Sequence, residues 1–365
     1  MKRALIVLLL LAIAAGGLFA EINVSGNATT GLAVFIEDGG PYFTLFTHPE
    51  WNNGPRYTAS ASLSGTNSSG KAGGSISAGR TSAGQANGGG EVWFIPVDGL
   101  RVRAGNIGIW WHANPPGYLD GNNQVDVGFG VFLESDGFEK AGLNWGVGIY
   151  PDRDGFGAVG GFADTRYTGY VKYKADLFTV GANATYNGGH WSPIPGNKAI
   201  DAAVGASTNV AGIGIAVNAV ANNVQDLTGS GSLAVGPVFD FGFGDLSASL
   251  GAELYIPVAG QKFGVAAGVG IGYPITGAIN LGVDALFSLN HALGDVTVPY
   301  DYRAGSQLPT GYNEGGTTHS LNVNPMLKIA TSYGGEMRIG YNFMTNIGGE
   351  SKMHNALYTA YRITF

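Results

Sequence analysis

The chain has 365 residues, with 62 glycines, no cysteine, 12% charged residues and a formal net charge of −7. The absence of cysteine excludes a disulfide scaffold, a zinc–thiolate site, an iron–sulfur cluster and a thiol nucleophile, and the negative charge argues against a nucleic-acid partner. The glycines have no three-residue period and occur together with 45% hydrophobic residues, which excludes collagen and a disordered linker.

Residues 1–20 form the first predicted element. Lys2 and Arg3 precede an uncharged apolar stretch, and the segment ends at Ala20. A basic start followed by a short apolar stretch is typical of a secretory signal peptide. The apolar stretch has about 12 residues, whereas a membrane-spanning helix needs about 20. We therefore expect residues 1–20 to be removed during export, with a junction near Ala20, and residues 21–365 to form the mature protein.

In the mature chain, apolar residues alternate with polar or small ones over many segments. Between Leu143 and Ile149, for example, every odd position is apolar and every even position is asparagine or glycine. Such a period of two is typical of a β-strand with one apolar face. Many of these runs reach about ten residues, the length of a tilted strand that crosses a bilayer, whereas strands in soluble proteins usually have five or six.

We count about eighteen such runs, with sixteen strands as the next alternative. The predicted strands cover residues 22–36, 56–65, 71–80, 91–97, 100–108, 124–134, 138–150, 165–174, 177–187, 198–208, 210–221, 232–241, 246–256, 261–273, 278–288, 319–330, 336–344 and 353–365. The run 91–97 is the weakest of them, because it contains Pro96 and proline cannot donate a hydrogen bond within a sheet.

The connections between these runs are alternately short turns and mostly longer loops. Short connections such as Asp98-Gly99 and Ala175-Asp176 contain residues that favour turns, and the longest loop runs from Leu289 to Thr318. An even number of strands places both termini of the chain on the short-turn side, which is the periplasmic side in outer-membrane barrels. A free sheet edge in lipid would leave backbone groups without hydrogen bonds. We therefore predict an all-β, antiparallel transmembrane barrel that the C-terminal strand closes.

In the last predicted strand, nearly every second residue is apolar or aromatic, up to the final residue of the chain. Tyr361, Ile363 and Phe365 lie on this face. The pattern resembles the C-terminal assembly signal of bacterial outer-membrane β-barrels. In size and layout the mature chain resembles the porins, whose barrels have sixteen or eighteen strands. The resemblance implies a bacterial outer-membrane location, outer-membrane lipid and the barrel assembly machinery as partners, and a homotrimer as one oligomeric state.

Three other classes of protein agree less well with the sequence. A secreted β-sandwich or β-solenoid would not need ten-residue strands or an apolar face without charges. A gated transporter with a plug needs about 22 strands and an N-terminal domain, whereas strand-like alternation begins directly after Glu21. An autotransporter needs a passenger domain, for which this chain has no room.

The predicted inward positions carry charged side chains in two groups. Candidate pore-lining residues with a basic excess are Arg101, Arg103, Asp126, Glu134, Lys140, Arg166, Lys172 and Lys174, and those with an acidic excess are Asp240, Glu253, Lys262 and Asp284. Two interpretations are open. The groups form a transverse field across a water-filled pore, as in porins, or polar lumen positions simply collect charges of both signs. Small inward residues such as Ser62 and Ser77 leave space in the lumen.

The third long loop is a candidate constriction. It contains Trp110, Trp111, His112, Tyr118 and Asp120. In the porins, which the chain resembles, the third loop folds into the barrel and narrows it. A surface loop ordered by its own aromatic residues is the alternative for this segment, and the long loop from Leu289 to Thr318 is a second candidate for the constriction.

The sequence gives little indication of catalysis or of a metal. The six histidines lack the spacing of metal ligands, and Asp152-Arg153-Asp154-Gly155 lacks the third oxygen ligand and the closing glutamate of a calcium loop. We therefore predict a non-enzymatic, porin-like channel for passive diffusion of small hydrophilic solutes and ions, with no cofactor and no metal. The alternative is a barrel whose loops occlude the pore and which serves as an adhesin or a structural protein of the outer membrane.

Overall fold

A computed structural model of the protein describes residues 19–36, 41–46, 57–81, 86–110, 124–135, 141–152, 165–188, 199–227, 231–256, 263–289, 320–332, 334–346 and 353–364. Most of these residues lie in β-strands. The elements are β1 Phe19–Ile36, β2 Tyr42–Phe46, β3 Tyr57–Asn67, β4 Ala72–Thr81, β5 Ala86–Val97, β6 Leu100–Trp110, β7 Gln124–Ser135, β8 Gly142–Asp152, β9 Arg166–Lys174, β10 Phe178–Asn187, β11 Ala199–Val210, β12 Ile213–Asn222, the 3-10 helix η1 Val224–Asp226, β13 Ser232–Phe243, β14 Leu246–Ile256, β15 Gly264–Pro274, β16 Ile279–Leu289, β17 Ser320–Ala330, β18 Glu336–Asn346 and β19 Met353–Thr364. In these ranges there is no helix of the length and apolar character needed to span a membrane.

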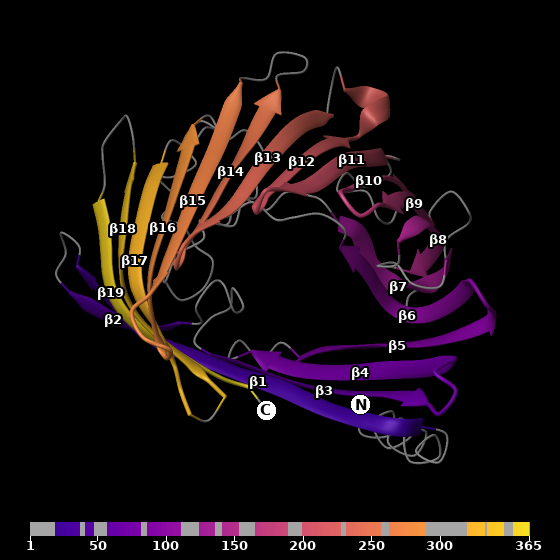
Figure 1. Ribbon diagram of the computed structural model, residues 1–365, viewed down its shortest axis with the longest axis horizontal. Coiled ribbons are helices and arrows are strands. Elements are labelled where there is room, and N and C mark those ends of the chain that lie inside the picture. Colours follow the sequence, from indigo (N-terminus) through magenta and orange to yellow (C-terminus); the bar gives the residue numbers. More distant parts are fainter. Residues whose placement is uncertain are drawn as a thin grey trace.

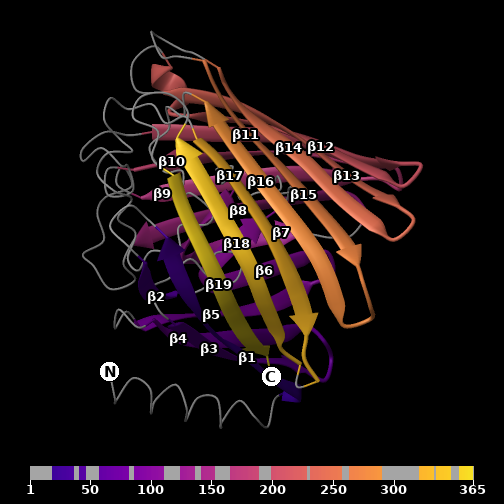
Figure 2. The ribbon, with the colours of Figure 1, turned by 90° about the vertical axis from the view of Figure 1, so that its left-hand side faces the viewer.

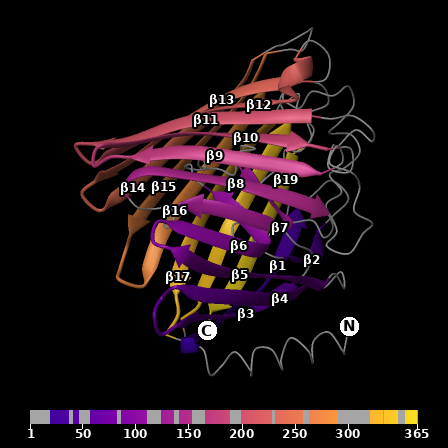
Figure 3. The same cartoon turned by 90° about the vertical axis from the view of Figure 1, so that its right-hand side faces the viewer.

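The strands form one antiparallel sheet that closes into a ring (Figure 1). From β3 to β19 each strand pairs with the next in the sequence, and β1 pairs with β19 along one edge and with β3 along the other. The side views show that the strands of the wall are tilted (Figures 2 and 3). Closure satisfies the backbone hydrogen bonds that an open edge would leave exposed to lipid. The predicted all-β barrel, closed by the C-terminal strand, is therefore confirmed.

The ring has eighteen strand positions although the sheet contains nineteen strands, because β2 and β3 share one position. The N-terminal part of β1 pairs with β3, from Phe19 opposite Asn67 to Thr30 opposite Tyr57. The same edge of β1 continues along β2, with Gly31 opposite Phe46. The eighteen predicted runs each correspond to one observed strand, whereas β2, with only five residues, was not predicted.

The weakest predicted run belongs to a longer strand that contains an irregularity. The strand β5 begins at Ala86, five residues before the predicted start at Glu91. The prediction started too late because the glycines at positions 88–90 give no hydrophobic alternation. The pairing of β5 with β6 is irregular between Phe94 and Val97, on either side of Pro96. Proline is tolerated in a strand where it interrupts the ladder in this way.

Short turns join the strands on one side of the barrel, as predicted. Residues 98–99, 211–212 and 244–245 form tight turns on this side. In the turn between β11 and β12, Ala211 and Gly212 have φ angles of 53° and 83°, and positive φ values at both central residues match the twist of an antiparallel hairpin. The start of β1 and the end of β19 lie on this same side, because Phe19 pairs with Asn67 and Glu336 pairs with Arg362.

The two faces of the wall differ in polarity. Large apolar side chains on one face remain exposed, among them Leu143 (64%), Val204 (54%) and Leu357 (52%). The alternate positions carry polar or small residues, and many of these, such as Asn144, are buried. In a closed ring the exposed apolar face is the outer face, and an outer apolar band with a polar interior is the arrangement of a transmembrane barrel.

Candidate functional site

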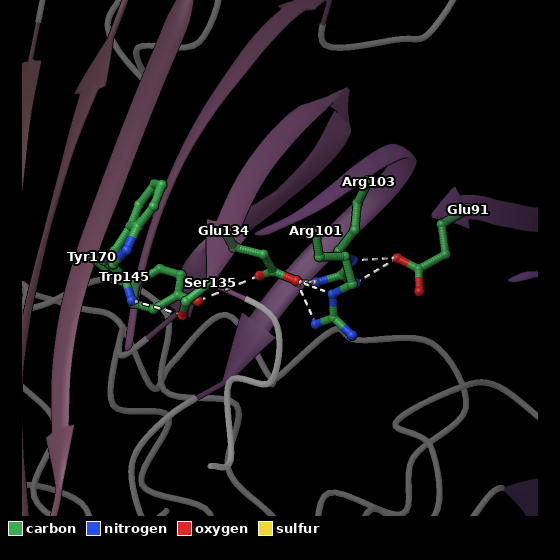
Figure 4. Close-up of polar contacts among 7 residues, drawn as sticks. All are labelled: Glu91, Arg101, Arg103, Glu134, Ser135, Trp145 and Tyr170. Carbon is green, nitrogen blue, oxygen red and sulfur yellow. Dashed lines mark hydrogen bonds and ion pairs between the residues drawn. The ribbon is translucent and has the colours of Figure 1, made fainter. Parts of the chain in front are cut away.

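Four charged side chains form a network on the inner face of β5, β6 and β7 (Figure 4). Arg101 and Arg103 are two residues apart on β6, so their side chains lie on the same face. The antiparallel register places Glu134 of β7 directly opposite Arg101, and Glu91 of β5 lies beside Arg103. The inward positions of three consecutive strands thus bring two guanidinium groups and two carboxylates together.

The network consists of charge-assisted hydrogen bonds. The Arg101 Nε donates to the Glu134 Oε1 at 2.6 Å, and the Arg103 Nε donates to the Glu91 Oε2 at 3.0 Å. In each arginine the Nη2 contacts the same oxygen as the Nε, which is Glu134 Oε1 for Arg101 and Glu91 Oε2 for Arg103. The Arg103 Nη1 also lies 3.7 Å from the Glu134 Oε1. The Glu134 side chain is 0% exposed, whereas Glu91 and Arg101 are each 23% exposed. The two positive charges are therefore balanced by two negative ones.

Aromatic side chains fix the position of Glu134. The Tyr170 hydroxyl of β9 donates to the Glu134 Oε2 at 3.3 Å. The ring of Phe132 is fully buried and stacks on Tyr170, with centroids 5.9 Å apart and an interplanar angle of 10°. Glu134 thus accepts hydrogen bonds at both oxygens, which lowers the cost of burying its charge.

Glycines on the neighbouring strand make room for these rings. A Cβ atom at Gly146 would lie 2.4 Å from both Phe132 and Tyr170, and one at Gly148 would lie 2.2 Å from Phe132. The same relation occurs between Tyr358 and Gly340, where the distance would be 2.3 Å. Part of the high glycine content therefore serves to let inward aromatic rings lie against the wall.

A second polar chain links β9, β10 and β11 to the segment around η1. The Arg166 Nε donates to the Asn187 Oδ1 at 2.7 Å, and the Asn187 Nδ2 donates to the Asp201 Oδ2 at 2.6 Å. The backbone N–H of Asn223 donates to the Asp201 Oδ1 at 2.8 Å. Asp201 thereby attaches this loop segment to the inner wall on the long-loop side. The predicted residues Lys172, which is buried, and Lys174 lie on the same face of β9 as Arg166.

The strands β13, β14 and β16, which carry three of the residues in the predicted acidic group, lie across the ring from β5, β6 and β7 (Figure 1). Asp240 of β13 is exposed on the inner face, and the Ser249 hydroxyl donates to its carboxylate. Asp284 of β16 is partly buried. Glu253 belongs to β14, but its side chain lies outside the described part of the structure.

The sequence-based prediction missed a third charged group near the short-turn side. The Arg338 Nε donates to Glu336, and the Arg362 Nη2 lies 3.5 Å from the Glu336 Oε2. Lys328 of β17 pairs in register with Arg338 and therefore shares the inner face. The alternation of β17 to β19 would have identified these residues as inward-facing. Basic side chains thus occur on both sides of the acidic positions.

The inner wall of β1, β3 and β4 is lined by small uncharged side chains. Ser62 lies opposite Ser25 on one side and opposite Ser77 on the other. The hydroxyl oxygens of Ser25 and Ser62 are 2.7 Å apart, and Ser25 and Ser77 are exposed. Among the described side chains on this part of the inner face, none is ionisable. This wall leaves space for water.

Several predicted site residues lie outside the described residues: Trp111, His112, Tyr118, Asp120, Lys140, Lys262 and Phe365. Asp126 lies in β7 and Trp110 ends β6, but their side chains are likewise not described. Tyr361 and Ile363 lie on β19, opposite Thr30 and Ala28 of β1, where the barrel closes. Over the described ranges, no group of three histidine or acidic residues could hold a metal ion.

No protein-family model matches the chain, and no curated protein matches its sequence. Solved structures match it in shape. OpdO of Pseudomonas aeruginosa has a TM-score of 0.56 and 10% identity, with 95% of this chain and 98% of that chain covered. OccAB4 of Acinetobacter baumannii has a TM-score of 0.55 and 10% identity, with 95% and 99% covered. The outer membrane protein opdK from P. aeruginosa has a TM-score of 0.51 and 11% identity, with 94% and 99% covered. The fold is therefore that of the porin-like outer-membrane β-barrels.

Proposed function

We propose that the protein is a bacterial outer-membrane channel for passive diffusion of small hydrophilic solutes and ions. The observation that carries this proposal is the closed ring of eighteen strand positions, with an exposed apolar outer face and a polar inner face. Rings of sixteen to eighteen strands are wide enough to leave an aqueous channel, whereas eight-stranded barrels are filled by side chains. The channel itself requires neither a catalytic group nor a cofactor.

Differences in exposure along the inner wall support a proposal for the path of solutes. Inward side chains of β7 to β9, such as Phe132, Glu134 and Lys172, are buried, and this part of the wall is packed. Inward side chains of β4 and β13, such as Ser77 and Asp240, are exposed. We propose that solutes move along the exposed serine and aspartate side of the lumen, with the packed side acting as a rigid support.

The proposal includes export and assembly. Residues 1–20 act as a signal peptide, residues 21–365 form the barrel, and Tyr361, Ile363 and Phe365 are read by the barrel assembly machinery. A homotrimer is the proposed oligomeric state, by resemblance to porins. The solved barrel OccK2 (OpdF) of P. aeruginosa, with a TM-score of 0.53 and 12% identity over 95% of this chain and 99% of that chain, was crystallised in complex with glucuronate. Glucuronate is therefore a suitable first solute to test.

The test is single-channel conductance of the purified mature protein in planar lipid bilayers, after its β-structure and membrane insertion have been verified. We expect stepwise conductance that rises with salt concentration, and swelling of proteoliposomes in glucuronate. The unfolded protein at the same concentration is the control. A folded and inserted barrel that passes no current would contradict the channel and favour the alternative of an occluded barrel with an adhesive or structural role.

A further inference from the structure

We propose that Glu91 is a selectivity-determining residue, which cancels the charge of Arg103 on the lumen wall and so keeps this wall from favouring anions. The inference rests on the proposed channel function. It concerns the same inner wall, and it assigns a role to a residue that the alternation of the sequence did not single out.

The two carboxylates of the network differ in accessibility. Glu134 is 0% exposed and binds Arg101, Arg103 and Tyr170, so it belongs to the packed wall. Glu91 is 23% exposed and binds Arg103 through one oxygen, Oε2. Within the described residues its other oxygen has no partner in the protein. Glu91 is therefore the member of the network whose charge can be removed without leaving a fully buried group unpaired.

Removal of the Glu91 charge would leave a net positive charge on the wall. Glu134 lies within hydrogen-bonding distance of Arg101 and is 3.7 Å from the Arg103 Nη1. One carboxylate would then face two guanidinium groups. The inner face beside Glu91 cannot compensate, because the register places uncharged Ser75 opposite it on β4 and Gly105 opposite it on β6.

The size of the effect follows from Coulomb's law. One unit charge about 7 Å from a permeating ion in water changes the local concentration of a monovalent ion about threefold without screening and about 1.6-fold at 0.1 M salt. Because anions and cations change in opposite directions, the ratio of their concentrations changes about threefold at 0.1 M salt. The Debye length is about 10 Å at 0.1 M salt and about 3 Å at 1 M. A change of charge at Glu91 should therefore alter the ratio of anion to cation permeability at low salt, and this change should be much smaller at 1 M salt.

The experiment measures reversal potentials in a KCl gradient for Glu91→Gln, Arg103→Gln and the double variant. We expect Glu91→Gln to raise the chloride-to-potassium permeability ratio about threefold and Arg103→Gln to lower it by a similar factor. The double variant should return to the value of the unmodified protein. Asp98→Asn is the matched control, because Asp98 forms a similar ion pair with Lys71 (3.0 Å) at a turn, where both side chains are more than half exposed.

The outcomes separate this inference from the proposed function. Conducting channels with unchanged reversal potentials in both single variants would overturn the inference, and so would an equal shift in Asp98→Asn. If Glu91→Gln fails to fold, the comparison of Arg103→Gln with the double variant still decides it: a shift toward cations in Arg103→Gln that is absent in the double variant supports the inference, and the same shift in both overturns it. An inserted, unmodified barrel that does not conduct would instead overturn the channel function and the inference with it.

Discussion

Replacing Gly148 with alanine is expected to destabilise the barrel, because the added Cβ would lie 2.2 Å from Cδ2 of Phe132. Ordinary contacts between carbon atoms are about 3.5–4.0 Å, so the ring would have to move by more than about 1 Å. Phe132 cannot move freely, because it is fully buried, stacks on Tyr170 and lies against Gly146. Overpacking of this kind costs about 1–3 kcal/mol.

A double-variant experiment tests this explanation. Phe132→Ala should by itself cost about 3–5 kcal/mol, because a large buried ring is lost. In the Phe132→Ala background, however, Gly148→Ala should have little further cost, since the two ring atoms closer than 3.0 Å are gone and the remaining near atom, Thr168 Cγ2, would lie at 3.3 Å. The control is Gly169→Ala on β9, where the nearest atom to an added Cβ would be the Gly146 carbonyl oxygen at 3.6 Å. That change should alter stability by less than about 0.5 kcal/mol.

The assay is the free energy of unfolding in urea, measured for the barrel in lipid vesicles by tryptophan fluorescence. The reasoning would be refuted if Gly148→Ala were as stable as Gly169→Ala. It would also be refuted if the cost of Gly148→Ala were the same with and without the Phe132 ring, because the two substitutions would then be additive and not in contact.

Two further predictions concern the outer face and the long-loop side. Val204→Arg places a charge at an exposed outer position in the middle of β11 and should reduce stability in lipid vesicles by about 2–4 kcal/mol. Ser207→Arg, at an exposed position on the inner face of the same strand, should have little effect. Equal losses of stability in the two variants would contradict the assignment of the two faces. Asp201→Ala removes the acceptor for the Asn223 N–H and for the Asn187 Nδ2, so amide hydrogen exchange in residues 223–227 should accelerate. The control Asp240→Ala should leave that exchange unchanged. Protection equal to that of the unmodified protein in Asp201→Ala would show that Asp201 does not hold this segment.

The alternation of the sequence was sufficient to predict eighteen of the nineteen strands, because one face of each strand meets an apolar environment and the other does not. All eighteen predicted runs occur as strands. The short strand β2 was missed because five residues give too little alternation, and its position is fixed by pairing with β1. The early start of β5 was missed because consecutive glycines carry no hydrophobic signal.

The charged network could be predicted only in part. The period of two identified Arg101, Arg103 and Glu134 as inward-facing, but alternation within one strand does not give the register between strands. The ion pairs therefore could not be derived, and the basic excess expected around β6 omitted Glu91, which starts the weakest predicted run. Arg338 and Arg362 follow the same alternation and could have been included. The candidate constriction loop stays a prediction, because residues 111–123 lie outside the described structure.

The pairing of β1 has a consequence for the order of folding. Along one edge β1 binds β19, so that Ala28 lies opposite Ile363 near the other end of the sequence. Every other neighbouring pair around the ring joins strands that are close in the sequence: consecutive strands throughout, except that β1 pairs with both β2 and β3 along its other edge. Local hairpins can therefore form one after another, whereas the last seam must wait for the final strand and carries nearly the whole cost of bringing distant parts of the chain together. Until that seam forms, two unpaired strand edges must be shielded from water, lipid and other chains, and the time spent in this open state should limit how fast the barrel matures.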